Sequence, residues 1–147
     1  MNTLPLTFAP TTLLLPVVAL ALWTLLILLL VPIARVRSGL ARQVTFEDFK
    51  YGESARVPPH VTLPNRVFMN LLEVPVLFYT ACVVAFVSGQ ANPLLVTLAW
   101  VYVALRVMHS LIYLSYNRVP HRLAVFAASN VVVAAMWLIV GWRLLPA

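Results

Sequence analysis

Charged residues are scarce in this sequence. Only 10% of its 147 residues are Asp, Glu, Lys or Arg, whereas 63% are hydrophobic and the mean hydropathy is +0.96. In soluble domains about a quarter of the residues are charged, so the composition excludes a soluble globular fold. The chain is therefore predicted to be an integral membrane protein. Because a spanning helix needs about 20 residues, it has room for no more than about five spans.

Cysteine and acidic residues are also few. The single cysteine, Cys82, has no second thiol to pair with, which excludes a disulfide framework, and no histidine or cysteine cluster has metal-ligand spacing. Four acidic residues accompany ten Lys and Arg, for a net charge of +6. Such an excess suggests nucleic acid binding in a soluble protein, but here most basic residues border apolar segments and act as topology signals. We expect no metal and no nucleic-acid partner.

Four apolar segments form one expected membrane domain over residues 1–147. Spans are predicted at about 13–34, 66–87, 94–116 and 120–142, with a polar loop at 35–65. Six Lys and Arg residues lie in that loop and at Arg66, so the positive-inside rule places the loop and the Arg118–Arg122 corner in the cytoplasm and both termini outside. Short connections make neighbouring spans antiparallel. The expected fold is an all-α, four-helix up-down bundle.

Polar side chains interrupt two of these spans in a helical pattern. In the second span, Arg66, Asn70 and Glu73 stand at i, i+4 and i+7 and share one helix face. In the third span, residues spaced by four and three positions form a stripe of Tyr102, Arg106, His109, Tyr113 and Tyr116. A polar stripe on a membrane helix faces the protein interior or a wet cavity, so we expect both stripes to turn inward.

Two interpretations of the stripes are open at this level. Glu73 and an arginine can neutralise each other between helices, with Asn70 as an interhelical hydrogen-bonding residue. However, one carboxylate cannot neutralise the four arginines expected near one membrane face, namely Arg66, Arg106, Arg118 and Arg122. Unpaired guanidinium groups match the geometry of carboxylates. We therefore favour a binding site for an anionic ligand.

The same segments resemble a known family, the membrane-associated proteins in eicosanoid and glutathione metabolism (MAPEG). Arg66-x-x-x-Asn70-x-x-Glu73, with Pro75 and Phe78 after it, is similar to the second-helix signature of the family. The run 106–113 and the corner 118–122 resemble the third-to-fourth-helix segment of its microsomal prostaglandin E synthase and glutathione transferase branch. Residues 74 and 123 depart from the residues of the eicosanoid-specific enzymes, so the resemblance does not extend to one eicosanoid activity. The stretch 45–53 matches no catalytic motif.

The resemblance implies a homotrimer in membrane lipid, with glutathione bound between adjacent subunits near the cytoplasmic face. It implies a glutathione-binding set of Arg66, Asn70, Glu73, Arg106, His109, Tyr113 and Arg118, with Arg35 or Arg37 reaching in from the first span. Arg122 matches the catalytic arginine beside the glutathione sulfur. The implied activity is that of a glutathione transferase or peroxidase acting on lipophilic electrophiles or lipid hydroperoxides. The alternatives are a non-catalytic lipid-binding or scaffold protein on the same fold, and an enzyme that uses another anionic thiol.

Overall fold

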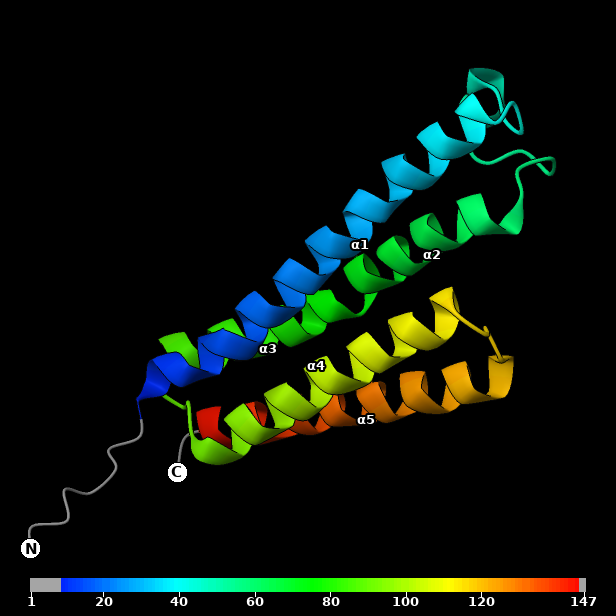
Figure 1. The fold of residues 1–147 in the computed structure, drawn as a ribbon. Helices are drawn as coiled ribbons and strands as arrows, with labels where there is room; N and C mark the ends of the chain where they lie inside the picture. The colour runs from blue at the N-terminus through cyan, green and yellow to red at the C-terminus, as the bar shows by residue number, and fades with distance from the viewer. Residues whose placement is uncertain (1–8, 146–147) are drawn as a thin grey trace, which may run out of the picture.

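The computed structural model describes residues 9–145 as an all-α bundle. The helical segments that are long and apolar enough to cross a membrane are Pro10–Leu40, Pro59–Val87, Pro93–Leu114 and Val119–Leu144. Figure 1 shows them running up and down, with the first and last described residues at one end and the connections 41–58 and 115–118 at the other. The expected all-α, four-span fold is thus confirmed.

The first span consists of a short 3₁₀ turn, η1 (Pro10–Leu13), and the long helix α1 (Leu14–Leu40). Helix α1 continues through Arg35 and Arg37, which we had expected in the loop. Basic side chains near the end of a helix are favourable because its C-terminus carries partial negative charge. The polar loop is therefore shorter than 35–65. It covers 41–58 and contains one 3₁₀ turn, η2 (Phe46–Phe49).

The second span is divided by a proline into α2 (Pro59–Glu73) and α3 (Pro75–Val87). It begins at Pro59 rather than near Arg66, because proline is favourable at the first position of a helix. Pro64, two residues before the predicted start, is buried inside α2. Pro75 has no N–H group for the carbonyl of the preceding turn, so the helix breaks at residue 74.

Two long helices complete the bundle. Helices α4 (Pro93–Leu114) and α5 (Val119–Leu144) each begin within one residue of the expected start. Helix α4 has an N-cap, since the side chain of Asn92 accepts a hydrogen bond of 3.2 Å from the N–H of Leu95. The α4–α5 corner turns at Asn117, whose φ of 45° lies in the left-handed region that asparagine tolerates better than most residues.

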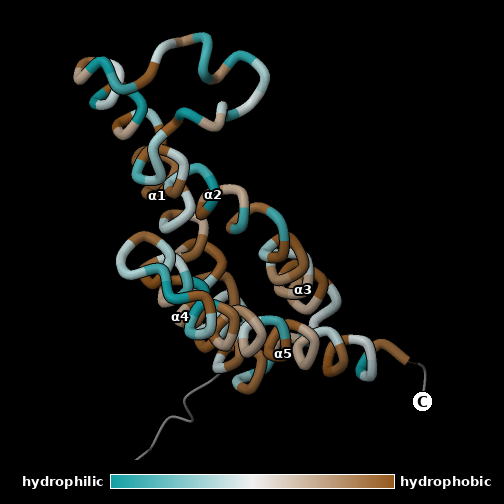
Figure 2. Tube along the Cα trace, turned by 90° about the vertical axis from the view of Figure 1, so that its right-hand side faces the viewer, coloured by the Kyte–Doolittle hydropathy of each residue, from teal (hydrophilic) through white to brown (hydrophobic). Residues whose placement is uncertain are grey.

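The core is narrow, and the outward faces are as apolar as the interior. Fully buried side chains come from every span, among them Leu20, Leu71, Phe78, Tyr102 and Met136. Large exposed apolar side chains on the outward faces include Leu22, Leu29, Val131 and Leu138. In Figure 2 hydrophobic residues cover the spans, and hydrophilic residues gather in the loop 41–58. Such outward faces suit the lipid of a bilayer, so this is a multi-pass membrane protein.

The α1–α2 pair and the α4–α5 pair do not run parallel along their whole length. In Figure 1, α1 and α3 lie close to the α4–α5 pair at the end that holds the first and last described residues, whereas α1 and α2 diverge from that pair toward the connecting loops. Two cavities open in the loop half of the bundle. One of about 280 Å³ lies between α2, α4 and α5, and one of about 640 Å³ lies between α1, α2 and the end of α4.

Candidate active site

The smaller cavity brings together polar residues from three helices. Its polar lining consists of Asn70 from α2, His109 and Tyr113 from α4, and Arg122 from α5. Its apolar lining consists of Val119, Leu123 and Phe126. His109 and Tyr113 share a side of α4 because they are four residues apart. Four residues that the sequence singles out therefore surround one space, which we call the α2–α4–α5 cavity.

Arg122 is held at this cavity from two sides. Its guanidinium carbon lies 4.0 Å from the centre of the Tyr113 ring, which is a cation–π contact. Its Nη1 donates a hydrogen bond of 2.8 Å to the side-chain oxygen of Asn117. Its Nε and Nη2 have no partner among residues 9–145, so they are available to an anionic group. An arginine stays protonated, and it can therefore stabilise negative charge but cannot act as a base.

His109 contributes an aromatic wall and unused hydrogen-bonding groups. Its ring is 6.0 Å from the ring of Tyr113, edge to face, and 5.7 Å from the ring of Phe126. The residue is only 4% exposed, and its ring nitrogens have no hydrogen-bond partner in the described part of the chain. Either tautomer of the ring offers one donor and one acceptor to a ligand.

Arg106 does not line the cavity but fixes a residue that does. It is 0% exposed, and its Nη2 donates to the backbone oxygen of Asn70 at 2.6 Å and to its side-chain oxygen at 2.7 Å. Asn70 lies in the last turn of α2, where carbonyl groups lack intrahelical partners and a cation is favourable. Because Arg106 occupies the side-chain oxygen of Asn70, the NH₂ group of that amide is left for contacts with a ligand.

Three other charged residues of the predicted set lie on the surface of the single chain, namely Arg66, Glu73 and Arg118. None of them forms an ion pair or a side-chain hydrogen bond within residues 9–145. The neutralisation of Glu73 by an arginine, which was one interpretation of the sequence, is therefore not found in this part of the chain. Charges on membrane-spanning helices face the protein interior or a wet cavity rather than lipid.

The two arginines of α1 lie apart from the α2–α4–α5 cavity. Arg35 forms an ion pair of 3.5 Å with Glu53, and its guanidinium carbon lies 4.6 Å from the centre of the Phe49 ring. Arg37 lines the larger cavity, together with Ser38, Gln43, His60 and mostly apolar residues of α1 and α2. Both arginines point to the loop 41–58 or to α2, because α1 packs there in the loop half of the bundle. Within one chain they do not join the other predicted site residues.

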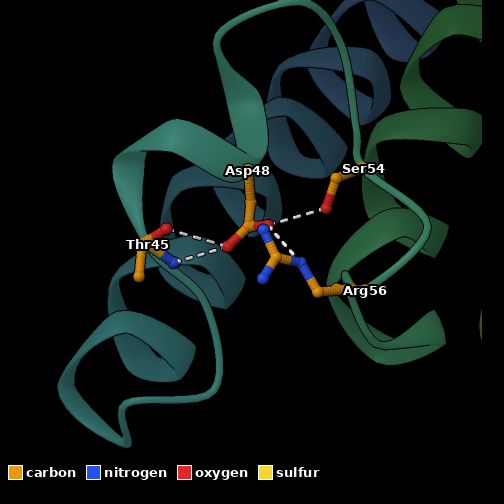
Figure 3. A network of polar contacts seen from close by, with 4 residues as sticks. All are labelled: Thr45, Asp48, Ser54 and Arg56. Carbon is orange, nitrogen blue, oxygen red and sulfur yellow. Dashed lines mark hydrogen bonds and ion pairs between the residues drawn. The ribbon is translucent and has the colours of Figure 1, made fainter.

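The loop 41–58 contains a polar cluster that our reading of the sequence missed. Asp48 accepts hydrogen bonds from the hydroxyl of Ser54 at 2.7 Å and from the N–H and hydroxyl of Thr45 at 2.9 Å (Figure 3). Arg56 adds an ion pair of 3.6 Å. The bond from Ser54, then those from Thr45, lower the pKa of Asp48 to about 2. The Thr-x-x-Asp spacing of a capping box was the available signal.

Asn117 and Phe126 are further residues of the site that our reading of the sequence did not assign. Asn117 contacts Arg122, and Phe126 lines the cavity with its ring 5.5 Å from the guanidinium carbon of Arg106. Their spacing of five and four residues from known site positions was the only signal in the sequence. Within residues 9–145 no group of three or more His, Cys, Asp or Glu side chains is arranged to hold a metal ion.

Comparison with known proteins assigns the chain to a family. The model of the MAPEG family matches residues 13–142, which include α1, α2, α3 and α4 entirely and nearly all of α5. No curated protein and no solved structure matches the chain. The match covers well over half of the sequence and agrees with the four-helix membrane bundle and with the motifs in α2, α4 and α5. This chain belongs to the MAPEG family, the membrane proteins of glutathione and eicosanoid metabolism.

Proposed function

We propose that this protein is a glutathione-dependent membrane enzyme of the transferase or peroxidase type, with its active site at the α2–α4–α5 cavity. The observation that carries the proposal is the convergence of Asn70, His109, Tyr113 and Arg122 on one cavity of about 280 Å³. Members of the MAPEG family generally use glutathione, which supports this ligand class. The substrates are lipophilic electrophiles or lipid hydroperoxides that enter from the bilayer.

The charges of the site complement those of glutathione, which has two carboxylates, one ammonium group and one thiol. Arg66, Arg118 and the NH₂ group of Asn70 provide donors for the carboxylates and the peptide oxygens. Glu73 provides the acceptor for the ammonium group. Arg66, Glu73 and Arg118 are exposed and unpaired within residues 9–145, so they can bind a ligand without first breaking an internal ion pair.

The catalytic role falls to Arg122. The thiol of bound glutathione would join an electrophilic carbon, while the leaving group departs and the thiol proton is released. In the peroxidase reaction this thiol and that of a second glutathione would become a disulfide, while the hydroperoxide becomes an alcohol and water. Arg122 would present Nε and Nη2, which have no partner among residues 9–145, to the sulfur, where a cation favours the thiolate over the thiol. Tyr113 keeps the guanidinium in place at 4.0 Å. Leu123 and Phe126 line the same cavity with apolar surface, which suits a lipophilic substrate.

A second subunit completes the site in this proposal, and the assembly is a homotrimer. Arg66 and Glu73 lie on a membrane-spanning segment and are exposed in the single chain, and charges at such positions do not face lipid. A neighbouring subunit therefore covers them. Of the two arginines of α1, Arg35 is engaged by Glu53. Arg37 has no ion pair in the described residues, so it is the one that reaches the glutathione of the neighbour.

The proposed active site faces the cytoplasm. The loop 41–58 contains Arg42, Lys50 and Arg56, and the α4–α5 corner at the same end contains Arg118 and Arg122. By the positive-inside rule these two basic connections are cytoplasmic, which leaves both termini outside.

A second candidate function, lipid binding without catalysis, is favoured by the larger cavity. It measures about 640 Å³, and its walls are mainly apolar, with Leu30, Ile33 and Leu63 among them. Arg37 and His60 lie at the same cavity and suit the anionic head of a lipid. In this function the polar residues of the α2–α4–α5 cavity serve packing and assembly.

The two functions are separated by ligand binding and turnover with the purified full-length protein in detergent. We expect conjugation of glutathione to an aromatic electrophile or reduction of a lipid hydroperoxide. By calorimetry, glutathione should bind and its diester, which lacks free carboxylates, should bind far more weakly. Glutathione at about 100 times its dissociation constant should stabilise the fold by about 2.7 kcal/mol. Absence of both turnover and glutathione binding, with fatty-acid binding retained, would instead establish the lipid-binding function.

A further inference from the structure

We infer that Asn117 is a positioning residue for Arg122, holding the guanidinium in the orientation in which it meets the sulfur of the ligand. The inference rests on the proposed function and deepens it. Asn117 does not line the α2–α4–α5 cavity, and it acts through the hydrogen bond of 2.8 Å from Nη1 of Arg122 to its side-chain oxygen.

The backbone of Asn117 is fixed by the end of α4. Its N–H donates a hydrogen bond of 2.8 Å to the carbonyl oxygen of Ile112, and its φ is 45°. In this left-handed conformation glycine and asparagine are the favoured residues. Only asparagine adds an acceptor for an arginine. The conformation of the corner thus brings the acceptor to Arg122, which is five residues further along the chain.

Asn117 and Tyr113 restrict different motions of Arg122. The centre of the Tyr113 ring lies 4.0 Å from the guanidinium carbon and holds the group over the ring. A contact with a ring face leaves the guanidinium free to turn above the ring. The hydrogen bond at Nη1 removes this freedom, and Nε and Nη2 then stay available for the ligand. An arginine that is ordered before binding loses less conformational entropy when it meets the sulfur.

The simplest alternative is that the bond only closes the α4–α5 corner. The corner itself offers a matched control, because a second contact bridges it. Nδ1 of His121 lies 3.3 Å from the hydroxyl of Tyr116, and these two residues are also five apart. Both are exposed, and neither lines the cavity. Tyr116→Phe removes this bridge without a change at Arg122. A purely structural role predicts similar behaviour for variants of Asn117 and of Tyr116.

The first test measures the freedom of Arg122 without glutathione. The full-length protein in detergent is treated with phenylglyoxal, which modifies arginine, and the labelling rate of Arg122 is followed by mass spectrometry. Asn117→Gly keeps the left-handed corner but removes the acceptor, so its Arg122 should react several times faster. Asn117→Asp keeps an acceptor, so its Arg122 should react at the wild-type rate or more slowly. In Tyr116→Phe, Arg122 should react at the wild-type rate. An unchanged rate in Asn117→Gly overturns the inference.

The second test measures turnover against pH. Asn117→Gly should lower kcat on the order of tenfold, with a much smaller change in KM, because misplacement of a catalytic group acts mainly on the transition state. The rising limb of its pH–rate profile should move to higher pH, because an Arg122 guanidinium that is no longer held in place favours the thiolate less. Asn117→Asp should move the limb in the same direction, since its carboxylate offsets the charge of Arg122. Tyr116→Phe should keep the wild-type profile.

The two tests separate failure of the inference from failure of the proposed function. If Asn117→Gly and Tyr116→Phe lose activity and thermal stability in parallel, with unchanged pH profiles, the bond is structural and the inference is wrong. If the wild type has no glutathione-dependent turnover, the proposed function is wrong. In that case the labelling rates still decide whether Asn117 positions Arg122.

Discussion

Two polar clusters of this chain differ in how completely their groups are paired. In the loop 41–58, the Asp48 carboxylate has partners on both oxygens, from Thr45, Ser54 and Arg56 (Figure 3). At the α2–α4–α5 cavity, Arg122 uses only Nη1 for a hydrogen bond within the described chain. A cluster whose groups are all paired organises the chain. A cluster with unused donors beside a cavity has groups that a ligand can bind.

The buried layer beside the cavity also contains polar groups without partners. Arg106 has Nε and Nη1 buried without a hydrogen-bond partner among residues 9–145, and so has the hydroxyl of Tyr102. Buried polar groups without partners cost free energy, and a cation inside a membrane bundle costs more. The Asp48 cluster has no comparable deficit. Unpaired buried groups thus occur in the layer beside the cavity and not in the Asp48 cluster, and within residues 9–145 Trp23, Arg35 and Asn130 each have one as well.

The largest effect is expected from Arg122→Ala. Removal of the group that stabilises developing negative charge should lower kcat/KM by about 10²- to 10³-fold. The fold should persist, because Arg122 is only half-buried at a cavity wall. Initial-rate assays with an aromatic electrophile measure kcat/KM, and thermal unfolding measures the stability of the fold. Arg143→Ala is the matched control, since Arg143 is exposed near the other end of the same helix. Full activity in Arg122→Ala would place catalysis elsewhere.

The next effect in size is expected from Arg106→Met, which has a similar volume but no donors. The backbone and side-chain oxygens of Asn70 lose their partner, and the protein should lose about 1–3 kcal/mol of stability. Glutathione should bind on the order of tenfold more weakly, because the Asn70 amide is no longer held.

A double-mutant cycle identifies the route of this second effect. If Arg106 acts through Asn70, then Arg106→Met should change glutathione affinity little in an Asn70→Ala background. Calorimetry on the four proteins gives the coupling. Additive losses would mean that Arg106 contacts the ligand directly and that the burial of its side chain in the free protein is relieved on binding.

The sequence predicts best what depends on periodicity. The stripe of α4 turns inward as expected at Tyr102, Arg106 and His109, which are buried, because a 3.6-residue repeat fixes which residues share a face. The prediction was wrong for Tyr116, at the end of the stripe, which is exposed. It predicts helix boundaries less well. The start of α2 at Pro59 was missed because Pro64, just before Arg66, also resembles a helix start.

Contacts across a corner or between helix ends were beyond reach of the sequence. The bond from Arg122 to Asn117 depends on a left-handed φ that the sequence permits but does not require. The separation of Arg35 and Arg37 from the cavity depends on where the loop end of α1 lies, and no periodic pattern encodes that position. Asn70, His109, Tyr113 and Arg122 were found because the motifs of the family carry them.

A smaller and more selective effect is expected from Glu73→Gln. Glu73 is exposed and unpaired within the described chain, so the fold should be unaffected. Glutathione should lose roughly 1 kcal/mol of binding free energy, as expected for one partly solvated charge pair. A deaminated glutathione, which lacks the ammonium group, should bind both proteins equally by calorimetry. An equal loss for both ligands would show that Glu73 does not contact the ammonium group.

The smallest effect is expected from Asp48→Asn, and it should stay within the loop. The asparagine amide presents N–H groups to donors of Thr45 and Ser54, so the loop should open while the unfolding of the membrane spans is unchanged. Proteolysis with a protease active near neutral pH should cut the variant faster within 45–57. Cutting of the spans in the variant would contradict the local role of this cluster.

The same loop should also open as the pH falls. The pKa of Asp48 is lowered from 3.8 to about 2 in the folded loop, so folding favours the ionised carboxylate. Its contribution is complete above the ordinary pKa and is lost as the pH falls through about 2. Cutting of the wild-type loop by pepsin should therefore increase between pH 4 and pH 2, relative to a control peptide of the same sequence. The Asp48→Asn loop has no carboxylate at this position and should show no such increase. If it does, another acid controls the loop. The fully paired Asp48 cluster would then not be what holds the loop, and its contrast with the partly paired cavity would not stand.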